Sequence, residues 1–283
     1  MEKIKVMIEL IGEASVPLLE AWESMLDDAG GSREIDVDGY LRNFSADVIA
    51  RACFGSDFTT GEEIFYKLRQ LQKAISQQDT LVGLSAVCSR HCPASYGGSA
   101  EDYIVDNCKN IYFAGHETAA VTTTWCLMLL ATHPLWQDRA RAEALEVCRG
   151  CTKVDVDVLR RLKTITMVIQ ETLRLYPPAS LIVREALTDF KLGALDVPRG
   201  TIVQTAVAML HLDKDVWGQD AGEFRPDRIC AGQNLAMVEL KVVLVRLLSK
   251  FAFSPSPGYR HAPLFRLTIE PGFGMPLVVT KLP

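Results

Sequence analysis

The amino-acid sequence predicts a mainly α-helical protein with a small β region. Two observations support this fold class. Before residue 177, most of the chain consists of segments in which apolar side chains recur at the spacing of an amphipathic helix. After Pro177 and Pro178, which stop a helix, the pattern changes to short extended segments bounded by turns, which is typical of strands.

Helices are expected wherever this periodicity is sustained. The expected ranges are 1–29, 40–52, 62–78, 101–133, a helix opening at Pro134, and 163–176 and 233–251. Gly30 and Gly31 end the first of them. The last is apolar nearly all round apart from a stripe of Glu239, Arg246 and Lys250, which predicts a helix buried in the core.

Strands are expected in several short pieces. The ranges are 35–37, 181–186, 190–192 and 201–206, with a terminal hairpin formed by 267–269 and 277–279. Between the helices, residues 81–100 are rich in breakers and have no period, which predicts a loop or a splice junction. Cys88, His91 and Cys92 in this stretch lack the second ligand pair of a zinc finger, so zinc is disfavoured.

Composition excludes several classes of function. The chain has 283 residues, of which 48% are hydrophobic, so it can bury a sizeable core. Its net charge of −5 and the scattered Lys and Arg residues leave no basic surface for nucleic acid. Eight cysteines without a secretory signal favour a reducing compartment. No apolar run is long enough to cross a bilayer, so no membrane anchor is expected within this chain.

The longest expected helix carries polar residues in its middle, at Ala114-Gly115-His116-Glu117-Thr118. Glycine inside a helix costs about 1 kcal/mol relative to alanine, so Gly115 indicates close approach of a ligand or another backbone. Thr118 can donate its hydroxyl to the Ala114 carbonyl, and with Glu117 it forms a potential proton relay. A zinc-protease helix is excluded because position 120 is alanine. A core helix with a polar kink remains the alternative.

A second candidate site begins at Cys230, in Cys-Ala-Gly-Gln-Asn-Leu-Ala. A cysteine at the N-terminus of a helix is favoured as a thiolate by the free backbone N–H groups and by the helix dipole, so Cys230 is a plausible metal ligand. Gly232 and Ala236 keep the adjoining helix face low enough for a flat group such as a porphyrin. The alternative is a buried cysteine beside closely packed helices.

Three further segments carry charged residues. Glu171 and Arg174 lie on one face of the 163–176 helix, where an exposed pair would contribute only about 0.2–0.5 kcal/mol. Arg184 directly follows an apolar strand, and residues 224–228 read Phe-Arg-Pro-Asp-Arg immediately before the Cys230 segment.

Together these segments resemble a cytochrome P-450, a haem-thiolate monooxygenase. Residues 114–118 resemble the oxygen-activating motif of the family's central helix, and Glu171 and Arg174 match its Glu-x-x-Arg pair. Residues 224–228 resemble the segment whose arginine completes the Glu-Arg-Arg cluster. The resemblance therefore implies the family's fold, and it covers the chain from about residue 1 to the C-terminus.

The resemblance also implies the site residues. Cys230 falls on the axial ligand of the haem iron, with Gly232 and Ala236 beside the haem. Arg184 falls on a propionate-binding arginine. Ala114 and Gly115 fall on the part of the central helix that lines the cofactor, and Glu117 and Thr118 fall on the catalytic acid-alcohol pair.

The implied reaction inserts one oxygen atom from O2 into an apolar substrate. The cofactor is haem (iron protoporphyrin IX), and electrons come from NADPH through a partner reductase, since the chain has no Gly-x-Gly-x-x-Gly fingerprint. The wording of the motifs is most similar to the plant members that oxidise gibberellins and related terpenoids. The resemblance also implies a location at the cytosolic face of the endoplasmic reticulum membrane.

The chain also departs from the family pattern. Only Ile229 separates Arg228 from Cys230, where the family has a meander and a Phe-x-x-Gly-x-Arg loop. Residues 81–100 replace helices expected before the central one, and the chain begins downstream of the family's anchor and first helices. We therefore expect residues 1–283 to form a single partial domain with deletions near 81–100 and at 228–230. The alternative function is a catalytically impaired fragment or splice form with a defective haem site.

Overall fold

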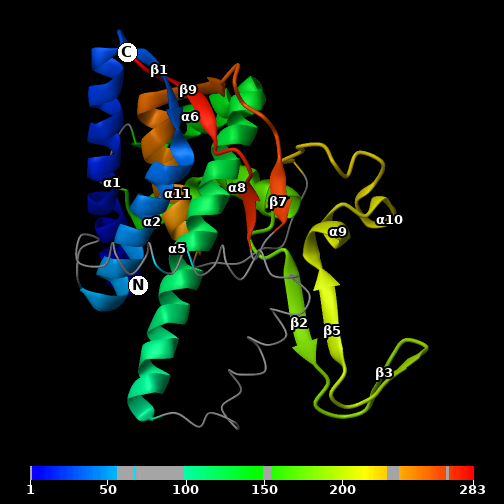
Figure 1. The fold of residues 1–283 in the computed structure, drawn as a ribbon. Helices are drawn as coiled ribbons and strands as arrows, with labels where there is room; N and C mark the ends of the chain where they lie inside the picture. The colour runs from blue at the N-terminus through cyan, green and yellow to red at the C-terminus, as the bar shows by residue number, and fades with distance from the viewer. Residues whose placement is uncertain are drawn as a thin grey trace.

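The computed structural model describes residues 2–55, 67, 70, 99–148, 154–227, 236–265 and 268–283. The helices within these ranges are α1 (Glu2–Asp28), α2 (Val37–Phe54), α5 (Ala100–Thr132), α6 (Pro134–Cys148), α7 (Val156–Arg161), α8 (Lys163–Leu175), α9 (Val207–His211), α10 (Lys214–Trp217) and α11 (Ala236–Lys250). The strands are β1 (Ser32–Asp36), β2 (Leu181–Glu185), β3 (Phe190–Leu192), β4 (Leu195–Val197), β5 (Ile202–Ala206), β6 (Phe251–Pro255), β7 (Pro263–Phe265), β8 (Ile269–Pro271) and β9 (Pro276–Lys281). The predicted fold class, mainly α with a small β region, is confirmed (Figure 1).

The ends of the first two helices are set by residues with known capping preferences, namely glycine after a helix and aspartate before one. Gly30 and Gly31, with φ of 73° and 97°, follow α1 in a backbone conformation that glycine adopts without strain. The Asp36 carboxylate accepts a hydrogen bond from the Asp38 backbone N–H at the start of α2, and Gly55, with φ of 64°, ends it. The helix expected over 62–78 and the loop expected over 81–100 lie outside the described residues, apart from residues 67, 70, 99 and 100.

The core lies where α11 packs against α1, α5, α6 and α8. On α11, the residues that are at most 1% exposed are Leu240, Val242, Val243, Leu244, Val245, Leu247 and Leu248, so the prediction of a buried helix is confirmed. Trp125 of α5 is fully buried. Its indole donates from Nε1 to the Ile269 carbonyl oxygen at 2.7 Å, and its ring stacks on Tyr176 with centroids 4.1 Å apart.

The C-terminal strands pair differently from the prediction. The expected hairpin of 267–269 with 277–279 is wrong. β8 pairs with β7, whereas β9 is the central strand of an antiparallel sheet in the order β1-β9-β6. The reason is burial, because Leu277 and Val279 of β9 are 0% exposed and lie opposite Ile35 of β1 and Phe253 of β6. This sheet joins β1, which follows the first helix, to β9 near the C-terminus.

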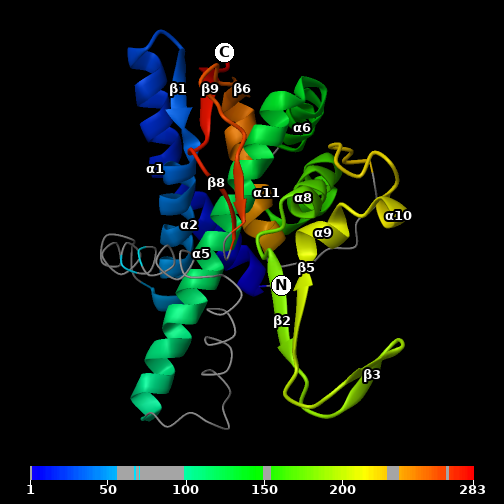
Figure 2. The same cartoon turned by 45° about the vertical axis from the view of Figure 1, so that its right-hand side comes forward.

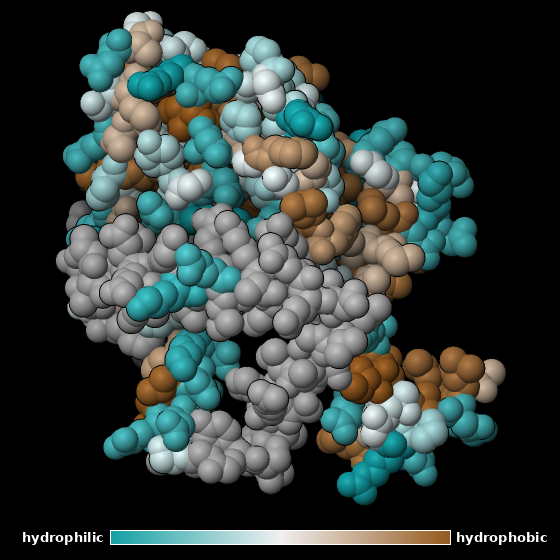
Figure 3. Space-filling model, in the orientation of Figure 1, coloured by the Kyte–Doolittle hydropathy of each residue, from teal (hydrophilic) through white to brown (hydrophobic). Residues whose placement is uncertain are grey.

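Two parts of the structure project from the helical body, and both leave apolar side chains exposed. In Figures 1 and 2, the N-terminal half of α5 and the β2–β5 and β3–β4 ribbons extend away from the core. On α5, Tyr103, Ile104, Val105 and Ile111 are 48–60% exposed. On the ribbons, Leu187, Leu192 and Leu195 are 53–74% exposed, and Figure 3 shows brown, apolar atoms there. Exposed apolar surface of this extent is unusual for a lone soluble domain.

Within the described ranges, none of the helices combines the length and the apolar composition needed to cross a bilayer.

Candidate functional site

In the middle of α5, Thr118 lies on the face of the helix that is more accessible to solvent. Thr118 Oγ1 donates to the Ala114 carbonyl oxygen at 2.8 Å, as predicted. Ala114 is exposed and Thr118 is half-buried, whereas Ala119, Ala120 and the residues that follow are buried. Because residues i and i+4 of a helix share a face, Ala114 and Thr118 together present a small-residue surface that is accessible from outside the helix.

Glu117 lies on a different face of α5 from its neighbour Thr118. Its side chain is 1% exposed and accepts a hydrogen bond from Arg42 Nη1 of α2. Arg42 is itself buried and donates from Nε to Asp38 Oδ2 at 2.8 Å. The structure therefore brings Glu117 to Arg42 and does not join it to the Thr118 hydroxyl, so the predicted acid-alcohol relay is not assembled in this arrangement.

Gly115 serves the packing of α2 against α5. A Cβ added at this position would lie 2.5 Å from Cδ1 and 2.7 Å from Cγ1 of Ile49, closer than carbon atoms approach in proteins. The missing side chain therefore makes room for Ile49 of α2. The neighbouring group is a side chain of α2, whereas the sequence raised a ligand or another backbone, and the assignment of Gly115 to the cofactor stays a prediction.

The ion pair of Glu171 and Arg174 is buried, with side chains 1% and 0% exposed. Two hydrogen bonds join them, from Arg174 Nε to Glu171 Oε2 at 2.8 Å and from Nη2 to Oε1 at 2.7 Å. The same guanidinium donates to the carbonyl oxygens of His211, Ala221 and Glu223. The pair is therefore a buried anchor for residues 211–223, and the weak exposed pair considered from the sequence is ruled out.

The predicted third member of that cluster, Arg228, lies outside the described residues. Residues just before it do reach the cluster, because the Arg225 backbone N–H donates to Glu171 Oε1 at 2.8 Å. The Arg225 side chain is exposed and pairs with Asp220 and Asp227.

Arg184 lies on β2, and its side chain is exposed. Its Nη1 donates to the carbonyl oxygen of the neighbouring Val183 at 2.8 Å. An exposed guanidinium held by a neutral carbonyl suits an incoming carboxylate, such as a haem propionate.

The predicted iron ligand Cys230 and its neighbour Gly232 lie outside the described residues, and of Ala236 only the backbone, at the start of α11, is described. Three of the predicted residues that are described fit a haem by chemical type. Ala114 and Thr118 offer an uncovered face of small side chains, and Arg184 offers a cation to a propionate.

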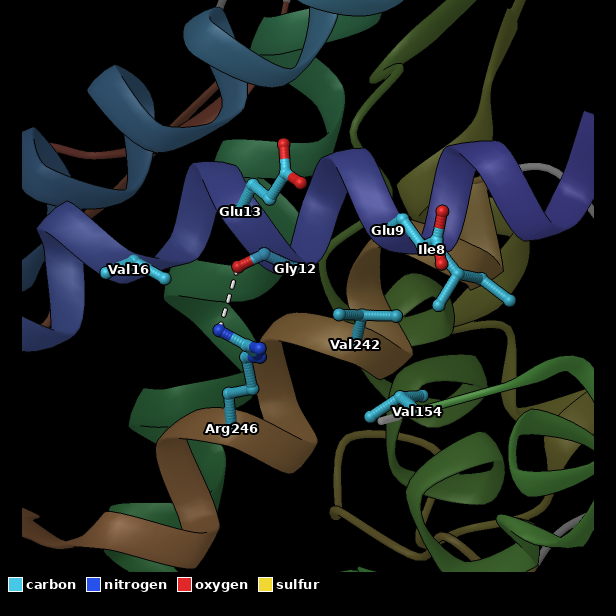
Figure 4. Close-up of a pocket in the computed structure, with 8 residues that line it drawn as sticks. All are labelled: Ile8, Glu9, Gly12, Glu13, Val16, Val154, Val242 and Arg246. Atoms are coloured by element: carbon cyan, nitrogen blue, oxygen red, sulfur yellow. Dashed lines mark hydrogen bonds between the residues drawn. The ribbon is translucent and has the colours of Figure 1, made fainter. Parts of the chain in front are cut away.

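A small pocket in the described part of the chain lies elsewhere, between α1 and α11 (Figure 4). It has a volume of about 150 Å³, below the range of about 300–1,000 Å³ typical of small-molecule sites. Arg246 Nη1 crosses it to the Gly12 carbonyl oxygen at 2.8 Å and also donates to Ser15 Oγ. This pocket is therefore a packing gap closed by Arg246, and it contains none of the predicted site residues.

Arg42 is the residue at this site that the sequence analysis missed. It stands between Leu41 and Phe44 on the expected 40–52 helix, where a cation beside buried apolar positions signals a buried partner. A buried cation indicates a carboxylate partner, but the sequence does not identify which carboxylate pairs with Arg42.

Comparisons with known proteins give a consistent result. The cytochrome P-450 family model matches residues 94–229 and 227–278. Cytochrome P-450 714C3 of Oryza sativa subsp. japonica is 59% identical over 350 residues, covering 100% of this chain and 68% of the relative. Cytochrome P-450 714B3 of Zea mays is 39% identical, covering 100% and 64%. Cytochrome P-450 714A2 of Arabidopsis thaliana is 36% identical, covering 97% and 67%.

The alignment with 714C3 is longer than this chain. The alignment with 714C3 spans 350 residues and the chain has 283, so 67 positions of the alignment have no counterpart here. The family match is also divided into two segments that meet at residues 227–229. The helical fold with small sheets, the buried Glu171–Arg174 pair and these matches agree, and the chain belongs to the cytochrome P-450 family, whose members are haem-thiolate monooxygenases.

Proposed function

We propose that this chain inserts one oxygen atom from O2 into an apolar, terpenoid substrate of gibberellin-like character. Its family gives the reaction class, haem-dependent monooxygenation. At the level of residues, the proposal rests on the face of α5 formed by Ala114 and Thr118. A methyl group and a hydroxyl are accessible on this face, whereas the residues of α5 that follow Thr118 are buried. The substrate class rests on the wording of the motifs.

Haem, when bound, supplies the activation of dioxygen. In this proposal the Cys230 thiolate would hold the iron, Gly232 and Ala236 would lie beside the porphyrin, and Arg184 would pair with a propionate. Ala114 would also line the cofactor. Gly115 would border the cofactor with its backbone, because Ile49 fills the place that a side chain would take there.

Glu117 and Thr118 divide the handling of protons between them. The Thr118 hydroxyl is the group on the accessible face, and its bond to the Ala114 carbonyl fixes where its oxygen lies. Glu117 is a buried acid behind it, held by Arg42. Direct proton transfer between the two requires the Glu117 carboxylate to leave Arg42. The ion pair with Arg42 therefore has to break before Glu117 can exchange a proton with Thr118.

The partners follow from the reaction. Electrons come from NADPH through a partner reductase, which must dock on this chain. We place the protein on the cytosolic face of the endoplasmic reticulum membrane, as its family implies.

The domain is proposed to be a single partial one spanning residues 1–283. The division of the family match at residues 227–229 supports a deletion at 228–230, and the start of that match at residue 94 supports one near 81–100. The 67 alignment positions without a counterpart in this chain support internal loss of sequence. The exposed apolar side chains of α5 are consistent with this proposal, because the loss of elements that cover a helix leaves apolar surface of this kind exposed.

The proposal is tested by expressing the full chain with ample haem and recording the spectrum of the reduced, carbon-monoxide-bound protein. We expect the red-shifted Soret band of a thiolate-ligated haem, lost in Cys230→Ser. Cys126→Ser is the matched control, because Cys126 is buried against Thr172 and has no role at the iron. A colourless protein of native helical content would favour the alternative, a catalytically impaired form with a defective haem site.

A further inference from the structure

Two cysteines lie at one end of the seam between α2 and α5. Cys53 is near the C-terminus of α2 and is exposed, and Cys108 is in the N-terminal half of α5 and is half-buried. Both are free thiols. The proposed function uses neither of them.

The register of the two helices is given by contacts along the seam. Thr124 Oγ1 of α5 lies 3.3 Å from Asp38 Oδ1 of α2. Further along, Arg42 pairs with Glu117. Residue numbers therefore rise on α2 as they fall on α5, so the helices run antiparallel.

The same register continues toward the two cysteines. Ile49 lies against Gly115, and Ala50 packs in one small cluster with Tyr112. Cys53 comes three residues after Ala50, and Cys108 comes four residues before Tyr112. Because steps of three or four residues return to the same face of a helix, both thiols face this seam one turn beyond the cluster.

The close approach of the helices strengthens this conclusion. Gly115 lets Ile49 approach the α5 backbone, so the axes lie close together at that point of the seam. Cys108 also acts on Cys53 electrostatically. Burial raises the pKa of the Cys53 thiol, and negative charge on Cys108 raises it further.

We propose that Cys53 and Cys108 form a redox-active dithiol that hydrogen peroxide converts into a disulfide joining α2 to α5. Peroxide oxidises one of the two sulfur atoms to a sulfenic acid, with one peroxide oxygen retained on the sulfur and the other released as water. The second sulfur then attacks the first, forms the S–S bond and expels the hydroxyl of the sulfenic acid as the second water. Two thiols lose two electrons and two protons, and one peroxide becomes two waters.

The disulfide has a structural consequence for α5. The N-terminal half of this helix projects from the body, and α2 is a main neighbour of the helix as a whole. A covalent bond at Cys108 ties the projecting half to α2 and closes a long loop of the chain, which stabilises the folded state by restricting the unfolded one. The thermal midpoint of the oxidised chain is therefore expected to exceed that of the reduced chain.

The test uses the full chain, reduced and freed of reductant, and then treated with hydrogen peroxide. Remaining thiols are blocked with iodoacetamide, and the protein is digested without reductant for mass spectrometry. We expect a linked pair of peptides containing Cys53 and Cys108, which dithiothreitol separates. Cys53→Ser and Cys108→Ser should each abolish this pair, whereas Cys126→Ser should leave it unchanged, because Cys126 is fully buried and burial raises its pKa to about 12.

A second measurement does not depend on the variants. Dibromobimane becomes fluorescent when it bridges two thiols, and it should link the same two peptides in the reduced, unsubstituted protein. Linkage of Cys53 to a different cysteine, or oxidation of both sulfurs without any linked peptide, would overturn the proposal. Failure of haem to bind would leave this outcome unaffected, so the dithiol is tested separately from the proposed monooxygenase.

Discussion

Arg42 of α2 and Glu117 of α5 form an ion pair whose side chains are 4% and 1% exposed. Burial disfavours the charge on Arg42, but the negative charges of Asp38 and then Glu117 outweigh this effect and raise the pKa of the guanidinium. The acid of the central helix is therefore part of the internal structure of the α2–α5 pair as well as a neighbour of Thr118.

Replacing Arg42 by methionine leaves the Glu117 charge buried without this partner. We expect the free energy of unfolding, measured by urea titration, to fall by about 3–5 kcal/mol. Lys109→Met is the matched control, since it breaks an exposed pair with Asp106 on α5 and should change stability by less than about 1 kcal/mol. Equal effects of the two substitutions would show that the Arg42–Glu117 pair is not buried as described.

Gly115→Ala tests the packing of α2 on α5. Alanine gains about 1 kcal/mol of helix propensity over glycine, but its Cβ overlaps Ile49, and overpacking typically costs about 1–3 kcal/mol. In an Ile49→Ala background the overlap disappears, so the same Gly115→Ala change should become stabilising. The free energies of unfolding of the unsubstituted protein, the two single variants and the double variant, measured with denaturant, give the coupling energy between the two positions. That energy would be near zero if Gly115 instead faced a ligand.

Glu143 of α6 caps a helix that has no cap of its own. Its Oε1 accepts from the backbone N–H groups of Lys163 and Thr164, and Oε2 accepts from Ile165, at 2.8–2.9 Å. Leu162 before α8 offers no side-chain hydrogen bond. Glu143→Ala should therefore lower the free energy of unfolding by about 1–2 kcal/mol.

The control for this prediction lies on the same helix. Glu146 is exposed, so Glu146→Ala should change stability by no more than about 0.5 kcal/mol. If both substitutions have the same small effect, the three backbone bonds to Glu143 do not contribute to stability.

Glu239 of α11 makes stability depend on pH. Burial raises the pKa of its carboxyl to about 7, an effect that the hydrogen bond from Ser45 only partly offsets. The folded state thus holds a proton that the unfolded state, with a pKa of about 4.5, releases. Below pH 4.5 the group has no effect, and between pH 4.5 and 7 the free energy of unfolding falls as pH rises, by about 1–3 kcal/mol in total.

Glu239→Gln should remove this fall and make the pH dependence of urea unfolding flatter over the same interval. Glu20→Gln on the exposed side of α1 is the control and should leave the slope unchanged. A slope that survives in Glu239→Gln would mean that another group titrates there.

Most helices of this protein could be predicted from sequence because they depend on local signals. Periodic apolar residues define α5 and α11, and Gly30, Gly31 and Pro177 mark helix ends through their own backbone preferences. The Thr118 bond to Ala114 was predictable for the same reason, since both residues belong to one turn of one helix. The terminal strands were not, because nothing local distinguishes a hairpin partner for 277–279 from β1, which is more than 200 residues away.

The sequence by itself determined the helical content, the family and the residue types of the site. Only the tertiary structure decided which residues meet: that Glu117 pairs with Arg42 and not with Thr118, and that Ile49 packs where a side chain at Gly115 would lie. The physical reason is that helix formation depends on neighbours three or four residues apart, whereas burial and charge pairing depend on how two helices pack. That packing is selected by the whole core at once.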